Sequence, residues 1–270
     1  MYFSMDELGF ENTERVKQIA SETEKWRFIY DIAKAYGFEG VHFTPSLYDE
    51  FGLSLENIPK YFQEFRLTLH AGGLFSLSLQ HDTSEIDTYL ARCFDVAVKH
   101  GMHDISVHPA VTHGLTVEKK QVSYANFERT IATWLAKAQE LGITFSLETH
   151  VTGDYFLFDG LAEYVEFIAK HPGLGVLIDI SHNFFDGFTE DEIIGFFGDK
   201  NVTGIHISDA LRRVDASFKE GTHLPVGKGA MDVARIVQHF KSINNVCGVL
   251  EIKCENEDLG ESLEKLREMV

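Results

Sequence analysis

The chain of 270 residues carries 24 Lys and Arg against 42 Asp and Glu, a formal net charge of −18 with His neutral. Nucleic-acid-binding proteins take much of their affinity from Lys and Arg at phosphates, so this balance disfavours long nucleic acids and anionic membrane surfaces as partners. A hydrophobic content of 44% is too high for a disordered chain, and we expect residues 1–270 to form one compact domain.

The sequence does not predict export or membrane insertion. The opening residues, MYFSMDE, lack the basic and apolar regions of a signal peptide, and no apolar run approaches the ~18 residues of a spanning helix. The three cysteines show no CxxC spacing, so neither a disulfide framework nor a thiolate metal site is indicated. We therefore expect a cytoplasmic protein without a membrane partner.

Short runs rich in β-forming residues alternate with longer amphipathic segments along the whole chain. We predict strands at 2–4, 40–44, 67–70, 104–108, 143–148, 175–179, 202–207 and 246–252. Ser84 is predicted to open a helix that ends at Gly101, and Ser123 one that ends at Gly142. Eight βα units in roughly 250 residues indicate an α/β protein with a single (β/α)8 TIM barrel. A doubly wound open sheet is the alternative, but no GxGxxG follows a strand.

The third to eighth predicted strands each carry a residue type that binds metals at their last or next-to-last position. These residues are His70, His108, Glu148, Asp179, His206 and Glu251. In the third, fourth and fifth strands, residues of the same parity are small and polar, whereas those of the opposite parity are bulky and apolar. The bulky set would pack against helices, so we expect the six polar side chains to point inward at the C-terminal end of the barrel, where such enzymes carry their active sites.

Three of these side chains, Glu148, Asp179 and Glu251, are carboxylates. Converging in one place, they would repel one another and lose hydration unless a cation compensates them. With His206 they provide four oxygen and imidazole ligands that suit Mn, Mg, Co or Zn. The residues therefore predict a site for a divalent metal ion.

The sequence resembles the xylose isomerase-like TIM-barrel superfamily, which contains sugar isomerases, ketose 3-epimerases, inosose dehydratases and the endonuclease IV family. The resemblance extends from residue 40 to the last strand and is carried by segments 147–149 (LET), 178–182 (IDISH), 204–209 (GIHISD), 223–229 (HLPVGKG) and 250–251 (LE). It implies the same barrel fold and a metal-dependent enzyme.

Resemblance to the ketose 3-epimerase branch implies the site residues. In that branch Glu, Asp, His and Glu on the last four strands hold the metal, which matches the four ligands predicted above. His182 and Arg212 match positions that contact sugar oxygens, and Asp154 stands where such enzymes carry a longer Glu. The implied partner is a small sugar or sugar phosphate. Dimers and tetramers are common in these families, so the resemblance also implies a homo-oligomer.

The reaction that this resemblance implies is α-proton abstraction. A divalent ion that polarises a ketose carbonyl and its neighbouring hydroxyl stabilises an enediolate, so a carboxylate can remove the α-proton at neutral pH. With Glu148 and Glu251 as the catalytic residues on opposite sides of the metal, deprotonation on one face and reprotonation on the other gives epimerisation. Proton transfer on a single face gives aldose–ketose isomerisation instead.

Resemblance to the endonuclease IV branch implies an alternative. His70 and His108 match two ligands of a second ion beside the first Glu, and His182 with His223 match two of three ligands of a third ion. Gly221 stands where that pattern has the remaining Asp, so we expect the third site to be incomplete. His70 and His108 could instead be hydrogen-bond partners of Glu148 that do not touch the metal. His223 is also a candidate to bind substrate. A zinc phosphoesterase acting on abasic-site DNA and an inosose dehydratase-like lyase are therefore the alternative functions.

Three other features of the sequence can be explained by structure alone, and two of them also have a functional interpretation. Lys and Arg residues follow the fourth and seventh strands. They are either solvent-exposed loop residues or residues that bind an anionic group of a small substrate. Residues 227–229 (GKG) form a turn or a phosphate cradle. His42 and His150 are assigned only packing or hydrogen bonding.

Overall fold

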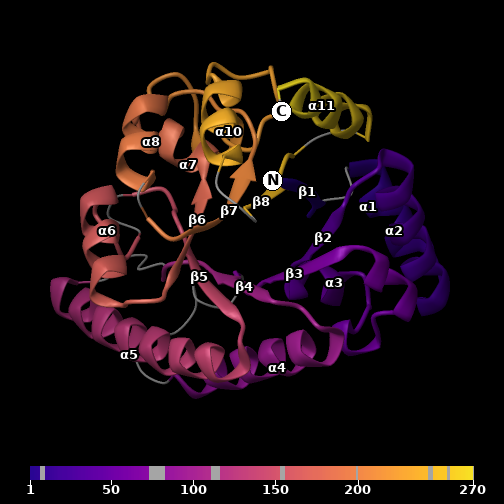
Figure 1. The fold of residues 1–270 in the computed structure, drawn as a ribbon, viewed down its shortest axis with the longest axis horizontal. Helices are drawn as coiled ribbons and strands as arrows, with labels where there is room; N and C mark the ends of the chain where they lie inside the picture. The colour runs from indigo at the N-terminus through magenta and orange to yellow at the C-terminus, as the bar shows by residue number, and fades with distance from the viewer. Residues whose placement is uncertain are drawn as a thin grey trace.

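Eight parallel strands in chain order close into a barrel, with the last strand returning to pair with the first (Figure 1). The computed structural model describes residues 1–6, 10–72, 83–110, 116–152, 156–198, 200–242, 246–253 and 256–269. Its strands are β1 (Tyr2–Met5), β2 (Gly40–Phe43), β3 (Arg66–His70), β4 (Asp104–Val107), β5 (Thr144–Glu148), β6 (Gly175–Asp179), β7 (Val202–Ile207) and β8 (Cys247–Leu250). The predicted (β/α)8 TIM barrel is confirmed, and each predicted strand is present with its ends within two residues of those predicted.

The helices form an outer ring around the strands (Figure 1). They are α1 (Phe10–Gln18), α2 (Glu22–Tyr36), α3 (Pro45–Glu50), α4 (Ser84–His100), α5 (Val117–Leu141), α6 (Leu161–Lys170), α7 (Ile180–Phe185), α8 (Glu190–Phe197), α9 (Phe218–Gly221), α10 (Val233–Lys241) and α11 (Asn256–Met269), with short 3-10 helices η1 (Leu55–Asn57) and η2 (Lys60–Glu64). Within the described ranges, none of these helices has the length and apolarity needed to cross a bilayer.

The ends of α4 and α5 test the predicted helix boundaries. Helix α4 begins at Ser84 and ends at Gly101, which adopts the left-handed conformation that favours glycine at this position. The predicted start of α5 at Ser123 is wrong. The helix begins six residues earlier, after Thr116, whose side chain accepts a hydrogen bond from the Lys119 backbone and so caps the helix. Ser123 is a buried residue inside the helix.

Small polar side chains of β3, β4 and β5 line part of the inside of the barrel, whereas the opposite faces of these strands are apolar. Ser146 of β5 lies 2.8 Å from Thr203 of β7, oxygen to oxygen, inside the barrel. On the outer side, the Phe145 ring packs at 5.8 Å from the Phe94 ring of α4, centroid to centroid. The predicted parity of these strands is therefore confirmed. TIM barrels are usually filled by branched apolar residues, so this polar interior allows the charged rim to continue inward.

Close approach of the paired residue Ser146 on β5 explains Gly175 at the start of β6. A Cβ built on Gly175 would lie 2.4 Å from the Oγ of Ser146, too close for any side chain. The glycine therefore lets the polar interior form without displacing the neighbouring strand.

Candidate metal centre

Every strand of the barrel delivers one titratable side chain to its C-terminal end. The set consists of Asp6 directly after β1, His42 in β2, His70 ending β3, His108 directly after β4, Glu148 ending β5, Asp179 ending β6, His206 in β7 and Glu251 directly after β8. Six of them are buried, and only His108 and Glu251 are partly exposed. Because parallel strands in register end at one rim, these side chains meet at one place. The six strand-end residues expected from the sequence are all brought together here.

Glu148, Asp179, His206 and Glu251 form the first group. One potential ligand atom from each lies within 4.8 Å of all the others. His206 Nδ1 is 2.5 Å from Glu251 Oε2 and 3.3 Å from Glu148 Oε1. Such a concentration of buried oxygen and imidazole ligands is the chemistry of a divalent-metal site.

The atoms that would bind the metal contact one another and the rim histidines, but no hydrogen bond of acceptable geometry pairs them. Both carboxylate oxygens of Glu148, Oδ2 of Asp179, Nδ1 of His206 and Oε2 of Glu251 are buried, and none makes a hydrogen bond of acceptable geometry to a described residue. Buried polar atoms normally have partners, and leaving one unpaired costs free energy. A divalent ion in the first group would bind one atom of each of its four residues, so these residues fit the metal ion that the sequence predicts.

Asp179 shows how local structure leaves one oxygen for an ion. The residue is the N-cap of α7, and its Oδ1 accepts hydrogen bonds of 2.8 Å from the His182 backbone and from the Ser181 hydroxyl. These bonds fix the orientation of the carboxylate and direct Oδ2 into the site. Thr149 accepts a 2.9 Å hydrogen bond from the Asp179 backbone N–H, which ties the ends of β5 and β6 together.

His70, His108 and Glu148 form a second group beside the first. The Nε2 atoms of the two histidines are 3.0 Å apart, and they lie 3.4 and 2.9 Å from Glu148 Oε2. His70 Nδ1 is 2.9 Å from Ser106 Oγ, which leaves its Nε2 directed at the group. The geometry suits a second ion that shares Glu148 with the first. It also suits the alternative in which His70 and His108 hydrogen-bond Glu148 without binding an ion, so the role of these two histidines stays a prediction.

Asp179, His182 and His223 form a third group. The Nε2 atoms of the two histidines are 3.0 Å apart, and His182 Nδ1 is 3.4 Å from Asp179 Oδ2. A Cβ built on Gly221 would lie 2.9 Å from the Phe185 ring, so the structure has no room for the Asp of the endonuclease pattern. Asp179 occupies the third position of this group instead.

Charge interactions set the protonation of the rim. Burial acts to raise the pKa of Glu148, but His108 and His206 outweigh burial and hold that pKa well below its ordinary value. For Glu251, His206 and His223 likewise outweigh burial and lower the pKa. Burial acts to lower the pKa of His206, but Glu148 and Glu251 raise it well above the ordinary value. Without a metal, His206 therefore carries the positive charge that a bound ion would replace.

Burial favours the neutral form of three other rim groups. Burial and the neighbouring His108 lower the pKa of His70 to about 3, and burial with His223 lowers the pKa of His182 to about 3. Burial and the nearby Glu251 raise the pKa of Asp6 to about 7. Neutral imidazole is the form that binds metals, so His70 and His182 need no deprotonation to act as ligands.

The predicted substrate residues lie in different positions. His182 and His223 are part of the rim. Arg212 Nη1 donates to the carbonyl oxygens of Phe184 and Phe188, 3.0 and 2.8 Å away, and the guanidinium stacks on the Phe184 ring. The structure thus holds Arg212 against the C-terminal end of α7, and its contact with substrate stays a prediction. Asp154 lies outside the described residues.

Asp6, His42 and His150 belong to the site but were not predicted to. Asp6 and His42 show the same strand-end signal as the other six, but the first predicted strand stopped at Ser4 and the second continued to Thr44. The His150 ring lies 4.6 Å from the His182 ring, centroid to centroid. Nothing in the local sequence distinguishes His150 from a packing residue.

Residues 227–229 act as a turn. Asp209 is buried and accepts hydrogen bonds from the backbone N–H groups of Gly227, Ala210 and Met231, at 3.0, 2.8 and 3.1 Å. The Gly227 amide that the phosphate-cradle interpretation requires is therefore bound to a carboxylate, which favours the turn interpretation.

A cavity at the opposite end of the barrel lacks this chemistry. It measures about 780 Å³, and Tyr2, Arg66 and Asp104 contribute to its lining. The candidate metal-ligand groups found among the described residues all lie at the C-terminal rim. The rim is therefore the candidate functional site.

Many solved structures share this fold, and the three described next are distant from this chain in sequence. A D-tagatose 3-epimerase-like protein superposes with a TM-score of 0.76 at 19% identity, covering 100% of this chain and 97% of its own. The IolI protein, solved with a bound zinc atom, gives 0.69 at 15%, covering 100% and 96%. An AP endonuclease of family 2 from Brucella melitensis gives 0.69 at 14%, covering 96% of each chain. At these identities the likeness shows the fold alone.

No curated protein matches the chain at a significant level. The family model described as "Xylose isomerase-like TIM barrel" matches residues 30–269, which is most of the chain. The protein therefore belongs to the xylose isomerase-like TIM-barrel family.

Proposed function

We propose that the protein is a divalent-metal-dependent isomerase or epimerase of a small ketose or sugar phosphate. The observation that carries the proposal is the first group, in which four buried or half-buried ligand side chains converge with one potential ligand atom of each within 4.8 Å of all the others. The solved relatives whose names include a 3-epimerase and a zinc-bound protein are consistent with it.

Glu251 is the better placed of the two predicted bases. Its side chain is 20% exposed, whereas that of Glu148 is 1% exposed and faces His108 and His70. A bound divalent ion would supply Lewis-acid polarisation of a substrate carbonyl. Glu251 can then receive the α-proton from the open side, with its pKa held low by His206 and His223. Glu148 would act from the opposite side, and His182 with His223 would orient substrate hydroxyls.

Exchange of the α-proton with solvent tests this proposal. Candidate ketoses incubated with the metal-loaded protein in deuterated water should gain deuterium at the α-carbon, as measured by proton NMR. Glu251→Gln should reduce the exchange by at least about 100-fold, because the amide cannot accept the proton but can still offer an oxygen to the metal.

Metal content of Glu251→Gln is measured in parallel, so that loss of the ion is distinguished from loss of the base. Glu140→Gln, which changes an exposed carboxylate on α5, is the matched control and should keep full exchange. Full exchange in a metal-loaded Glu251→Gln protein would show that Glu251 is not the base.

A zinc phosphoesterase is the second candidate, favoured by the second and third groups. Together the three groups could hold up to three ions, and such centres activate water and clamp phosphoryl groups. The net charge of −18 opposes binding to long DNA, which is why this candidate stands second.

Metal stoichiometry and cleavage of abasic-site DNA separate the two candidates. For the isomerase we expect one Mn, Co or Mg per chain and no cleavage of an abasic-site duplex. Two or three Zn per chain together with cleavage would establish the phosphoesterase instead. The same zinc-loaded sample is assayed with an undamaged duplex as the control.

A further inference from the structure

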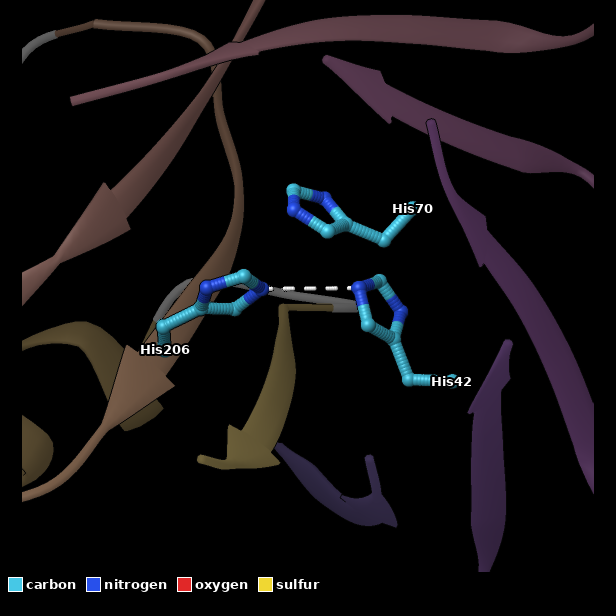
Figure 2. Close-up of side chains that lie close together, drawn as sticks. All are labelled: His42, His70 and His206. Atoms are coloured by element: carbon cyan, nitrogen blue, oxygen red, sulfur yellow. Dashed lines mark hydrogen bonds between the residues drawn. The ribbon is translucent and has the colours of Figure 1, made fainter. Parts of the chain in front are cut away.

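The His42 ring faces the ring of the predicted metal ligand His206 (Figure 2). Its Nε2 is 3.4 Å from His206 Nε2, across the barrel from β7. Its Nδ1 is 2.6 Å from Oγ1 of Thr68, the residue paired with it on β3. His206 turns its other nitrogen, Nδ1, toward Glu251 and Glu148. The side chains thus form a line from Thr68 through His42 to the ligand.

The protons along this line can be ordered in two ways. If Thr68 donates to His42 Nδ1, then His42 donates from Nε2, and His206 must keep its proton on Nδ1, where it blocks metal binding. If His42 donates from Nδ1 to Thr68, its Nε2 accepts from His206 Nε2, and the lone pair of His206 Nδ1 is available to the metal. Only the second order allows His206 to act as a ligand.

The His42 ring is buried, with little space around it. A small void of about 20 Å³ lies on the inner side of the site, lined by His42, Thr68, Ser106 and Ser146 among others. The His42 ring is 4% exposed and stacks on His70 at 5.4 Å, centroid to centroid. Packing and the hydrogen bonds at its two nitrogens thus act together on the orientation of the ring.

From this geometry we propose that His42 is a positioning residue that holds His206 in its metal-binding tautomer, with Thr68 fixing the tautomer of His42 in turn. The inference rests on the metal-binding part of the proposed function and is independent of the substrate. His42 acts through His206 and touches neither the ion nor the substrate.

Direct metal binding by His42 is the competing interpretation, because His42, His70 and His206 also form a group with ligand atoms within 4.8 Å. The contacts favour the positioning role. His70 directs Nε2 at His108 and binds Ser106 through Nδ1, so both of its nitrogens are engaged elsewhere. His206 likewise directs its Nδ1 at Glu251 and Glu148 and only its Nε2 at His42, so an ion held among the three histidines would lie on the other side of the His206 ring from both carboxylates.

Affinity for Co²⁺, measured by competition with a chromophoric chelator, tests the proposal. His42→Leu removes the acceptor, and loss of an outer partner of this kind should weaken binding by about 10- to 100-fold. His42→Gln can place an oxygen near the Nε2 position, so it should recover most of the affinity. Thr68→Val should weaken binding in the same direction, because His42 then loses the partner of its Nδ1–H, whereas Thr68→Ser should bind as the unmodified protein does.

Ser146→Ala is the matched control, since Ser146 is a polar residue of the same interior that bonds Thr203 rather than His42. It should leave the Co²⁺ affinity unchanged. Melting temperatures of the chelator-treated variants identify any general loss of stability. If His42→Leu does not fold, the Co²⁺ affinities of Thr68→Val and Thr68→Ser are compared instead, because only the Val variant lacks the hydroxyl that contacts His42.

Nitrogen-15 NMR of the zinc-loaded protein shows which ring nitrogen of each histidine carries the proton. A purely structural role of His42 would make no prediction about these positions. We expect protons on His206 Nε2 and His42 Nδ1. The proposal is overturned if His42→Leu and Thr68→Val bind Co²⁺ as tightly as the unmodified protein, if His42 carries its proton on Nε2, or if His42→Leu loses one whole ion per chain. Failure to bind any divalent ion would instead overturn the proposed function itself.

Discussion

At the scale of single residues, His223 is notable for its backbone. It is the only non-glycine residue with a positive φ, 56°, among those that the structure describes. The left-handed region costs a residue with a Cβ about 1–2 kcal/mol, and such strain is typical of functional sites. The Lys253 backbone donates to the His223 carbonyl at 2.8 Å, and His182 contacts the imidazole, so the surroundings hold the strained conformation.

This strain predicts an unusual order of stability for two variants. In the presence of chelator, His223→Gly should have a free energy of unfolding about 1 kcal/mol above that of His223→Ala, because only glycine relieves the Cβ contact. Urea denaturation measures both. The control is exposed Lys137 inside α5, where the Gly variant should be about 1 kcal/mol less stable than the Ala variant. The same order at both positions would contradict the strain at His223.

At the scale of elements, the strands were predictable and the helix starts were less so. Each strand is a short apolar run between glycines or polar residues, and the barrel pairs it with its sequence neighbours, so local pattern and final topology agree. Helix α5 was placed too late because Ser123 resembles an N-cap. Thr116, the actual cap, precedes a turn of charged residues without hydrophobic periodicity, where the pattern carries little information.

The candidate site was predictable where a ligand residue type coincides with the end of a strand. That rule found six of the rim residues. It would also have found Asp6 if the first predicted strand had ended two residues later, and His42 if the second had ended two residues earlier. His150 follows β5 in a loop, and its position depends on ring contacts with residues distant in sequence. Such contacts have no periodic signature, so a single sequence could not indicate them.

At the scale of the whole molecule, the negative charge is divided between surface and rim. The rim contains four carboxylates, Asp6, Glu148, Asp179 and Glu251, out of 42 acidic residues in the chain. The remainder keeps the net charge far from zero, which favours solubility and repels polyanions. The rim carboxylates oppose one another inside the protein, where solvent cannot screen them. A bound cation therefore stabilises the end of the barrel at which all eight strands meet.

Metal should consequently stabilise the entire fold. Above the dissociation constant, each tenfold rise in free metal adds about 1.4 kcal/mol to the free energy of unfolding, so the melting temperature should rise with the logarithm of metal concentration. Asp179→Asn keeps the oxygen that caps α7 but removes the charge that faces the site. Its melting curve should therefore require higher metal concentrations, while Glu140→Gln should follow the unmodified protein. Equal melting temperatures in chelator and in saturating Mn²⁺, Co²⁺ and Zn²⁺ would show that the rim does not bind an ion in the folded state.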